Sequence, residues 1–463
     1  MRLELPSQQQ QQQHQQPHQQ PEPEPQSQSR PVSPAERQFW FAERIAPGSP
    51  AWRVLSAIRV EGPLDRAALT EAARRVVARH PALRSVFTAK GGRLLRTVVP
   101  AAAEPPLLPL APCAGFRDAE RALSAPDLLD LDHGRHLALA LAPDPGAATA
   151  DGGPDTYGTA PVPAATLYVL THHIAYDGLS HEVFTADLAR AYARTVAGEP
   201  EPPAPPRSHG TPPEPSAARG EELVAYWRAA LDGVPDLPVE GPGPSQRELA
   251  GAEVRTHRVR FADGLGPAVR DAARRAACPP FAVLLTAYGQ ALAELSGADD
   301  FCVGTPVSLR TPDQADEIGC LLTTLPVRLR HLDAPAALPR VWETFTDGVL
   351  HMELPYDETV RATRTRPSRR MPLHQALFAY ESWQRPLHPA GPVRMHTVPV
   401  YPLGAQAEIQ FQLNELPGAR LEGVLQAPAD GVWAGRLPAL AAAVTRRLVA
   451  SAPNAPTIEE KVR

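Results

Sequence analysis

The sequence predicts an α/β protein, of the layered α+β kind, built as two lobes of similar size. Three observations lead to this class. The 463 residues are more than one hydrophobic core ordinarily supports. Strand-like and helix-like patterns alternate in both halves of the chain. Between the halves, the proline-rich stretch 199–220 excludes helix and central strand, and we expect an interdomain linker there.

The N-terminal lobe is expected at residues 32–198. Before it, residues 1–31 are mostly Gln, Pro, Glu and His and bury too little apolar surface to offset the entropy cost of ordering, so they predict a disordered tail. The composition and apolar spacing of the lobe then predict a strand at Trp52–Val60, a helix that begins near Leu64, a strand at Leu94–Val99, a long loop at 141–165 and a strand from Thr166.

The C-terminal lobe is expected at residues 221–463, and its patterns again mix helices with strands. Apolar residues at three- and four-residue intervals predict helices at Glu221–Leu231, Leu265–Ala277 and Phe281–Leu295. Apolar and β-branched runs predict strands at Glu253–Phe261 and Phe301–Pro306. Each lobe should therefore hold its own core of sheet and helices.

Charge and motif content exclude several classes of protein. A net charge of −5 argues against a nucleic-acid binder, and no stretch is long and apolar enough for a membrane span. The chain starts without a secretory signal pattern, so we expect a cytoplasmic location. The P-loop, G-x-G-x-x-G, G-x-S-x-G and H-E-x-x-H motifs are absent from the sequence, which leaves nucleotide-binding, serine-hydrolase and zinc-protease functions unsupported.

The cysteines predict thiols rather than a metal site. They are widely spaced, without a C-x-x-C pair or a nearby histidine at ligand spacing, and those in apolar stretches should be free and buried. The four positions are Cys113, Cys278, Cys302 and Cys320. We therefore expect no metal.

The best candidate for a site is the segment 166–178. Its first part has the composition of a strand, and side chains on a strand alternate between faces, so His172 and His173 should point to opposite sides. Gly178 permits a tight turn, after which Leu179–Val196 has a helical pattern with Ser180 as a candidate N-cap. A histidine at the end of a strand, directly before a turn and helix, is well placed to face a cleft.

The residue types at this turn fit acid–base chemistry. A neutral imidazole can take a proton from an amine or hydroxyl near neutral pH, or donate a hydrogen bond to a developing oxyanion. Asp177 could accept a hydrogen bond from a histidine or pair with an arginine. From the spacing alone, a satisfied and partly buried pair of histidines is an equally good interpretation.

His172 through Gly178 match the HHxxxDG signature, and the segment resembles the condensation domains of nonribosomal peptide synthetases. The resemblance extends from about Ser33 to about Ala450. Four further motifs of that family have similar counterparts, in the same order, at Ser33–Trp40, Arg79–Phe87, Gly304–Val307 with Ile318–Thr324, and Arg366–Leu373.

This resemblance implies a fold and an activity. The fold would be two chloramphenicol-acetyltransferase-like lobes arranged as a V, with the active site in a tunnel between them. The activity would be that of a free-standing acyltransferase of secondary-metabolite or antibiotic biosynthesis. It would move an acyl or aminoacyl group from a carrier-protein thioester to an amine, giving an amide, or to a hydroxyl, giving an ester. No intrinsic cofactor is implied, because the partner acyl or peptidyl carrier protein supplies the phosphopantetheine arm, and the acceptor would be a carrier-bound or free small molecule.

The resemblance also assigns roles to residues. His173 would be the catalytic histidine, with His172 in support, and Asp177 would anchor the structure through an arginine. Gly178 would keep the tunnel floor open, and the bulky Tyr176 would narrow the tunnel. Of the remaining polar residues in or near these motifs, we expect structural roles for His80, Arg84 and Arg370 and a solvent-facing position for His181.

The sequence departs from the family pattern in places, and alternatives follow. The proline-rich stretch replaces an expected Y-x-D-Y-x-x-W segment, and Thr323 stands where asparagine is usual. A cyclization domain would lack these histidines, and an epimerization domain would normally adjoin a carrier domain. A catalytically silent recruitment domain usually loses a motif histidine, whereas His172 and His173 are both present. These comparisons favour an enzyme, with a small-molecule or polyketide acyltransferase of the same superfamily as a further alternative.

Overall fold

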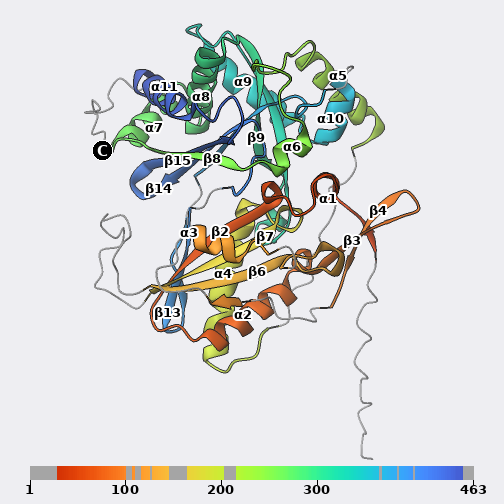
Figure 1. Ribbon diagram of the computed structural model, residues 1–463, viewed down its shortest axis with the longest axis vertical. Coiled ribbons are helices and arrows are strands. Elements are labelled where there is room, and N and C mark those ends of the chain that lie inside the picture. Colours follow the sequence, from red (N-terminus) through yellow and green to blue (C-terminus); the bar gives the residue numbers. More distant parts are fainter. Residues whose placement is uncertain are drawn as a thin grey trace, which may run out of the picture.

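The computed structural model has two α/β lobes, one above the other in Figure 1, as the sequence predicts. It describes residues 29–100, 107–109, 116–125, 128–144, 164–202, 215–363, 368–382, 385–399 and 402–451. Residues 1–28, and with them nearly all of the expected tail, lie outside this range, as do Cys113 and most of the expected loop 141–165.

The first lobe is built on a mixed sheet. Among the described residues this sheet has six strands in the order β12-β13-β2-β7-β6-β5. Their bounds are β2 (Arg53–Glu61), β5 (Leu107–Pro109), β6 (Leu137–Asp144), β7 (Ala164–His172), β12 (His388–Ala390) and β13 (Val393–Val398). A smaller sheet joins β1 (Arg30–Pro31), β4 (Arg93–Val98) and β3 (Ser85–Lys90). Residues 30 and 31 are thus paired with β4, and the predicted tail was too long at its C-terminal end.

Two helices cover one face of the larger sheet, and a shorter one lies on the other. α2 (Arg66–Arg79) and α4 (Gly178–Val196) pack on the face that includes Leu167 and Val169. Tyr168 and Leu170 point the other way, into a cluster with α3 (Phe116–Ala122). The alternation expected for strand β7 is therefore confirmed, and it buries both faces of the strand that leads to the two histidines.

The second lobe repeats this layering around its own core. Among the described residues its sheet has six strands in the order β10-β9-β11-β14-β15-β8. These are β8 (Val254–Arg260), β9 (Asp300–Ser308), β10 (Leu322–Arg330), β11 (Ala376–Glu381), β14 (Ile409–Leu416) and β15 (Arg420–Pro428). The helices are α5 (Ala217–Ala230), α6 (Gln246–Gly251), α7 (Leu265–Arg275), α8 (Pro280–Ser296), α9 (Ala337–Leu350), α10 (Tyr356–Thr363) and α11 (Leu437–Ser451). Helix α5 begins inside the predicted 199–220 linker, so the last four residues of that stretch are helical.

The boundary predicted at residue 221 does not separate the lobes completely. Strands β12 and β13 belong to the C-terminal half of the sequence, yet β13 pairs antiparallel with β2, from Arg394 opposite Glu61 to Val398 opposite Ala57. We call residues 385–408 the crossover segment, because the chain leaves the second sheet after β11 and returns to it at β14. Sequence periodicity could not reveal this exchange, since it reports the type of an element and not its partner.

Close backbone contacts hold the crossover segment against the first lobe. Gly62 has φ of +114°, and a Cβ there would lie 2.6 Å from the carbonyl oxygen of Pro392. At Gly404 a Cβ would lie 2.4 Å from the backbone nitrogen of Ala51. Glycine at these two positions therefore lets the backbones approach.

Membrane and thiol features follow from the described residues. Within them no single helix is long and apolar enough to cross a membrane, and only the pair α7 and α8, bent by 104°, has the length and composition together. Cys278, Cys302 and Cys320 are free thiols, as predicted.

Replacing Gly404 by alanine should test the packing of the crossover segment. The added methyl group meets backbone rather than a movable side chain, so Gly404→Ala should lower the free energy of unfolding by about 1–3 kcal/mol. Gly435→Ala is the matched control, because a Cβ there meets nothing within 4 Å. Denaturant unfolding of both variants measures the effect, and equal stability of the two would contradict the close approach.

Candidate active site

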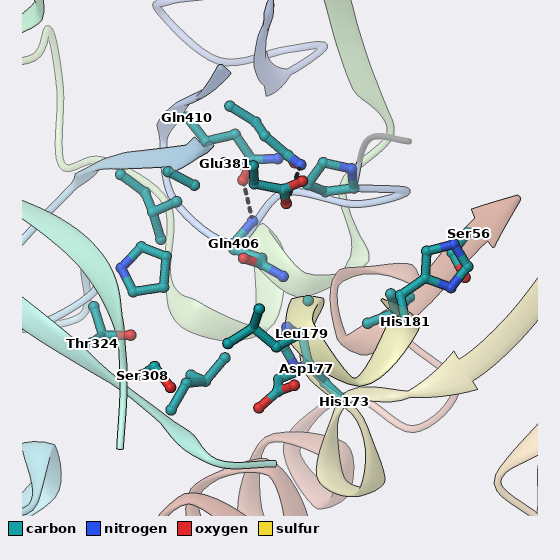
Figure 2. A pocket seen from close by; sticks show the side chains of 18 of the residues that line it. Ser56, His173, Asp177, Leu179, His181, Ser308, Thr324, Glu381, Gln406 and Gln410 are labelled. Atoms are coloured by element: carbon teal, nitrogen blue, oxygen red, sulfur yellow. Dashed lines mark hydrogen bonds between the residues drawn. The ribbon is translucent and has the colours of Figure 1, made fainter. Parts of the chain in front are cut away.

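The two motif histidines lie where strand β7 gives way to a short 3₁₀ turn, His173–Ala175. The ring of His173 stacks on Phe39 of helix α1 (Pro34–Ile45), with centroids 4.6 Å apart and planes within 9°. Figure 2 shows His173 close to Asp177 at one side of a pocket. Tertiary packing by α1 therefore fixes the orientation of the imidazole.

Burial keeps His173 neutral. Desolvation lowers its pKa to about 4; the charge of Asp177 opposes this shift and His172 adds to it. Its Nδ1 is buried and makes no hydrogen bond of good geometry within the described part of the chain. A neutral imidazole in this position can accept a proton near neutral pH.

His172 is held by its neighbours. Its Nδ1 accepts a hydrogen bond from the backbone N–H of Ile174 at 3.0 Å, which leaves the proton on Nε2. That Nε2 donates to Glu43 Oε2 at 3.3 Å. Burial alone would raise the pKa of Glu43, but hydrogen bonds from His172 and from the Gly48 N–H outweigh it, and the pKa is lowered. His172 is thus fixed in one tautomer under the turn that carries His173.

Asp177 joins the two lobes. Its Oδ1 accepts a hydrogen bond from Arg310 Nη2 at 2.7 Å, and its Oδ2 accepts one from the backbone N–H of Leu321 at 3.1 Å. Arg310 and Leu321 lie between β9 and β10 of the second lobe, and both charged side chains are almost fully buried. The predicted arginine partner of Asp177 is therefore confirmed. We call this contact the inter-lobe clasp.

Asp177 also begins helix α4. Its Oδ1 accepts from the Ser180 N–H at 2.8 Å, and Ser180 completes a capping box with the backbone N–H of Asp177. Ser180 is thus the third helical residue and not the N-cap that the sequence suggested. Ser180 Oγ also contacts the backbone of Gly319 at 3.1 Å, so the same helix start forms part of the clasp.

A cavity of about 270 Å³ lies between the lobes. Its lining includes, from the first lobe, Trp52, His173, Gly178 and Leu179, and from the second, Leu322, Tyr356 and His374; the crossover segment adds Pro399 and Gln406. His173 thus faces a partly open cavity that residues of both halves line.

Two predicted positions near the motif were wrong. Tyr176 does not line the cavity but is fully buried beneath α4, where its ring packs edge-on against Phe184. His181 is buried and lines the cavity instead of facing solvent. Its Nε2 donates to the carbonyl of Ala57 at 3.1 Å, and its Nδ1 lies 3.2 Å from the hydroxyl of Tyr176. Gly178 is the first residue of α4 and lines the cavity.

The arginines of the outer motifs lie away from the cavity. Arg84 Nη1 donates to the carbonyl of Val99 at 2.5 Å. Arg370 is buried and forms a two-pronged contact with Glu408, at 2.7 and 2.8 Å, and donates to the carbonyl of Leu237. Both residues therefore support the fold without lining the cavity.

Several polar residues of the cavity had no signal in the sequence. Glu381 ends strand β11, and Arg385, Gln406, Gln410 and Gln412 follow in the crossover segment and β14. They match no motif: the pairing of β11 with β14 brings Glu381, Gln410 and Gln412 together, and the crossover segment adds Arg385 and Gln406. Among the described residues there is no group of three or more His, Cys, Asp or Glu that could hold a metal.

The family model of the condensation domain matches residues 164–410, which include the His172–Gly178 signature. The chain belongs to the condensation-domain family. Phosphinothricin tripeptide synthetase PhsC of Streptomyces viridochromogenes is 30% identical over 385 residues, and the match covers 76% of this chain and 32% of that protein. Malpinin synthetase of Mortierella alpina is 27% identical over 370 residues, with 76% and 4% covered. This condensation-domain chain thus spans a third or less of the length of these two relatives.

Solved structures of similar fold cover most of this chain. The condensation domain of the Monacolin K polyketide synthase MokA superposes with a TM-score of 0.73 at 19% identity, covering 92% of this chain and 98% of that one. SgcC5 of Streptomyces globisporus gives 0.71 at 21%, covering 92% and 100%. The X-domain from teicoplanin biosynthesis, in complex with OxyB, gives 0.70 at 22%, covering 93% and 94%. The predicted two-lobed, chloramphenicol-acetyltransferase-like architecture is therefore confirmed.

Removing the charge of Asp177 should weaken the inter-lobe clasp. Asp177→Asn leaves Arg310 buried with no carboxylate partner, so we expect a loss of about 3 kcal/mol in the free energy of unfolding. Asp118→Asn is the control, because Asp118 forms an exposed ion pair with Arg121 and should change stability by under about 1 kcal/mol. Calorimetric melting of both variants is the measurement. A fully stable Asp177→Asn variant would show that the clasp does not hold the lobes.

Proposed function

We propose that this condensation domain transfers an acyl or aminoacyl group from a carrier-protein thioester to an amine or hydroxyl acceptor inside the inter-lobe cavity. The observation that carries the proposal is the position of His173. A neutral imidazole, stacked on Phe39 and held next to the inter-lobe clasp, faces a cavity to which both lobes contribute. In addition, both motif histidines and Asp177 are present, at the positions that the signature requires.

In this mechanism the acceptor nitrogen or oxygen attacks the thioester carbonyl carbon while His173 takes its proton. The new C–N or C–O bond forms, the C–S bond breaks, and the proton passes to the thiolate of the departing phosphopantetheine arm. That arm belongs to the carrier-protein substrate. His173 contributes general base help, and the cavity walls contribute positioning and exclusion of water.

His172 and Asp177 act through position in this proposal. His172, tied to Ile174 and Glu43, sets the turn from which His173 projects. Asp177 holds the start of α4 against the second lobe. The spacing between His173 and the cavity wall of the second lobe therefore stays fixed. The acylated product would be an amide or an ester according to the nucleophile, since the same base serves both.

The rival function is that of a recruitment domain, which binds a partner protein without catalysis. One solved structure of similar fold, the X-domain from teicoplanin biosynthesis, is a complex with another protein, OxyB. The two functions differ in what the histidine does. For an acyltransferase, loss of His173 strongly lowers turnover and leaves partner binding. For a recruitment domain, binding is the whole activity and His173 is dispensable.

His173→Ala should lower single-turnover acyl transfer by about 10²–10⁴-fold, the usual value of a general base. The assay mixes a panel of acylated carrier proteins with amines and alcohols and follows the carrier by intact-protein mass spectrometry. Carrier binding, measured by titration, should stay near that of the unmodified protein. His133→Ala is the control, since His133 is exposed and does not line the cavity. Near-normal turnover of His173→Ala would favour the recruitment function.

The His172→Ala variant separates support from chemistry. Because His172 caps the turn and contacts Glu43, its loss should lower the melting temperature as well as turnover. His173→Ala should leave the melting temperature nearly unchanged. Melting curves of the two variants compare these effects, and a stable His172→Ala enzyme without turnover would place His172 in the chemistry.

The acid limb of turnover should lie near pH 4. His173 must be neutral to accept a proton, and its pKa is lowered from 6.5 to about 4, so the active form persists through weakly acidic solution. Rates measured between about pH 4.5 and 8 should therefore not fall at 6.5 as they would for an exposed histidine. A titration near 6.5 in the single-turnover rate would contradict the buried neutral base.

Stability is the control for that pH profile. Burial also lowers the pKa of His136, His181 and His374 to about 4. Between about pH 6.5 and 4 the unfolded chain binds protons that the folded protein does not, so stability falls as the pH falls through this window. Melting temperatures at each pH identify the range in which the protein remains folded and the rates are meaningful.

A further inference from the structure

One wall of the cavity is polar. We call Glu381, Arg385, Gln406, Gln410 and Gln412 the polar wall, and all of them line the cavity. Figure 2 shows Glu381, Gln406 and Gln410 grouped on one side of the pocket, with His173 and Asp177 on the other and Leu179 between them. The surroundings are largely apolar, so this wall decides which polar groups a bound molecule can satisfy.

Side-chain N–H groups of the polar wall donate hydrogen bonds to oxygen atoms of neighbouring protein residues. Arg385 Nη2 donates to Asn414 Oδ1 at 2.7 Å and to Glu381 Oε2 at 3.2 Å. Gln412 Nε2 donates to Glu381 Oε1 at 2.9 Å. The remaining amide donors have backbone or side-chain acceptors: Gln410 Nε2 bonds Gly404 and Gln426, and Gln406 Nε2 bonds Ala51.

Acceptors are left over on this side of the cavity. Gln406 Oε1 makes no hydrogen bond within the described residues, whereas its Nε2 donates one to the carbonyl of Ala51. Each oxygen of Glu381 accepts one side-chain hydrogen bond in the structure. A carboxylate has about four lone-pair sites, so Glu381 can accept from a ligand as well.

His374 adds an acceptor in the second lobe. The hydroxyl of Tyr356 donates to the carbonyl of Pro372, so its oxygen accepts from His374 Nδ1 at 3.2 Å. The proton of His374 is therefore on Nδ1, and Nε2 is a bare acceptor with no hydrogen bond to the described residues. His374 is only 3% exposed and lines the cavity.

The neighbours of Glu381 offset only part of the free-energy cost of ionising its carboxyl group. Burial raises its pKa to about 7, although Arg385 and the hydrogen bond from Gln412 both act to lower it. The cost of holding this carboxylate ionised away from water is therefore only partly offset by the protein. A ligand that brings a positive charge and several N–H donors would offset the rest.

We propose that the acceptor substrate carries a protonated amine in addition to its nucleophilic group, and that Glu381 binds this ammonium, with Gln406 Oε1 as a second acceptor. The inference rests on the acyl transfer proposed above and specifies its acceptor. The nucleophilic end of the molecule lies toward His173, and the ammonium end is held on the polar wall. Glu381 is thus a specificity-determining residue, and the cavity discriminates against neutral acceptors of the same length.

The test begins with binding, which needs no acyl donor. The probes are 1,5-diaminopentane and its neutral isostere pentane-1,5-diol, titrated calorimetrically at about pH 8.5, where a carboxyl of pKa about 7 is ionised and the amines keep their protons. The unmodified protein should bind the diamine about tenfold more tightly than the diol or better. Glu381→Gln, which keeps the shape of the side chain, should abolish that preference.

The matched control is Glu343→Gln, since Glu343 is exposed on α9 and does not line the cavity. It should retain the preference for the diamine. In acyl transfer, Glu381→Gln should raise KM for the diamine about tenfold while kcat and the KM for the diol change little. Should Glu381→Gln melt at a lower temperature, Glu381→Asp keeps the charge and should keep part of the preference.

The outcomes separate this inference from the proposed function. Equal binding of diamine and diol by the unmodified protein, or an unchanged preference in Glu381→Gln, overturns the ammonium site even if acyl transfer occurs. Glu381-dependent diamine binding without transfer to any acceptor would instead contradict the proposed acyltransferase and keep the site.

Discussion

The buried pair of Asp177 and Arg310 is the contact on which the site depends. It caps the helix that follows the histidine turn, it reaches across to the second lobe, and it fixes the loop between β9 and β10 by way of Leu321. Arg310 in turn donates to the carbonyls of Gln314 and Glu317, so the loop is closed around the same guanidinium. One charged contact therefore sets the start of the helix, the conformation of the loop and the spacing of the lobes together.

Burial shifts the pKa of one ionisable group on each side of the cavity, and the two shifts have opposite directions. On one side, burial lowers the pKa of His173 to about 4 and leaves the neutral imidazole that the proposed acyl transfer would use as its base. On the other, burial raises the pKa of Glu381 to about 7, although the nearby Arg385 acts to lower it. The two groups come from different lobes, and they share one cavity only because the lobes are held together. The chemistry of the site is thus a property of how the lobes are held, and not of either lobe alone.

The sequence predicted many of the helices and strands, and the part of the site around His173 and Asp177. Side-chain spacing and short motifs, which carry these predictions, are properties of short stretches of sequence. The helix after Leu64 and the strand before His172 follow from side-chain spacing, and the arginine partner of Asp177 was implied by the resemblance to condensation domains. Tyr176 and His181 were placed wrongly because helix α4 packs against the sheet and buries both side chains, and this packing is not visible in local spacing. Glu381 and Gln406 could not be predicted, because strand pairing in the second sheet places the first and the path of the crossover segment places the second, and neither is visible in the local sequence.

The crossover segment has a consequence for how the chain acquires its structure. Strand β2 pairs with β13, which is made more than three hundred residues later in the sequence, as the pairing of Glu61 with Arg394 shows. During synthesis the backbone donors and acceptors on the open edge of β2 therefore stay unpaired until most of the second lobe has been made. The first lobe therefore depends on the second half of the chain: a cut at the proline-rich stretch would leave the second sheet with all six of its strands but would take β12 and β13 away from the first.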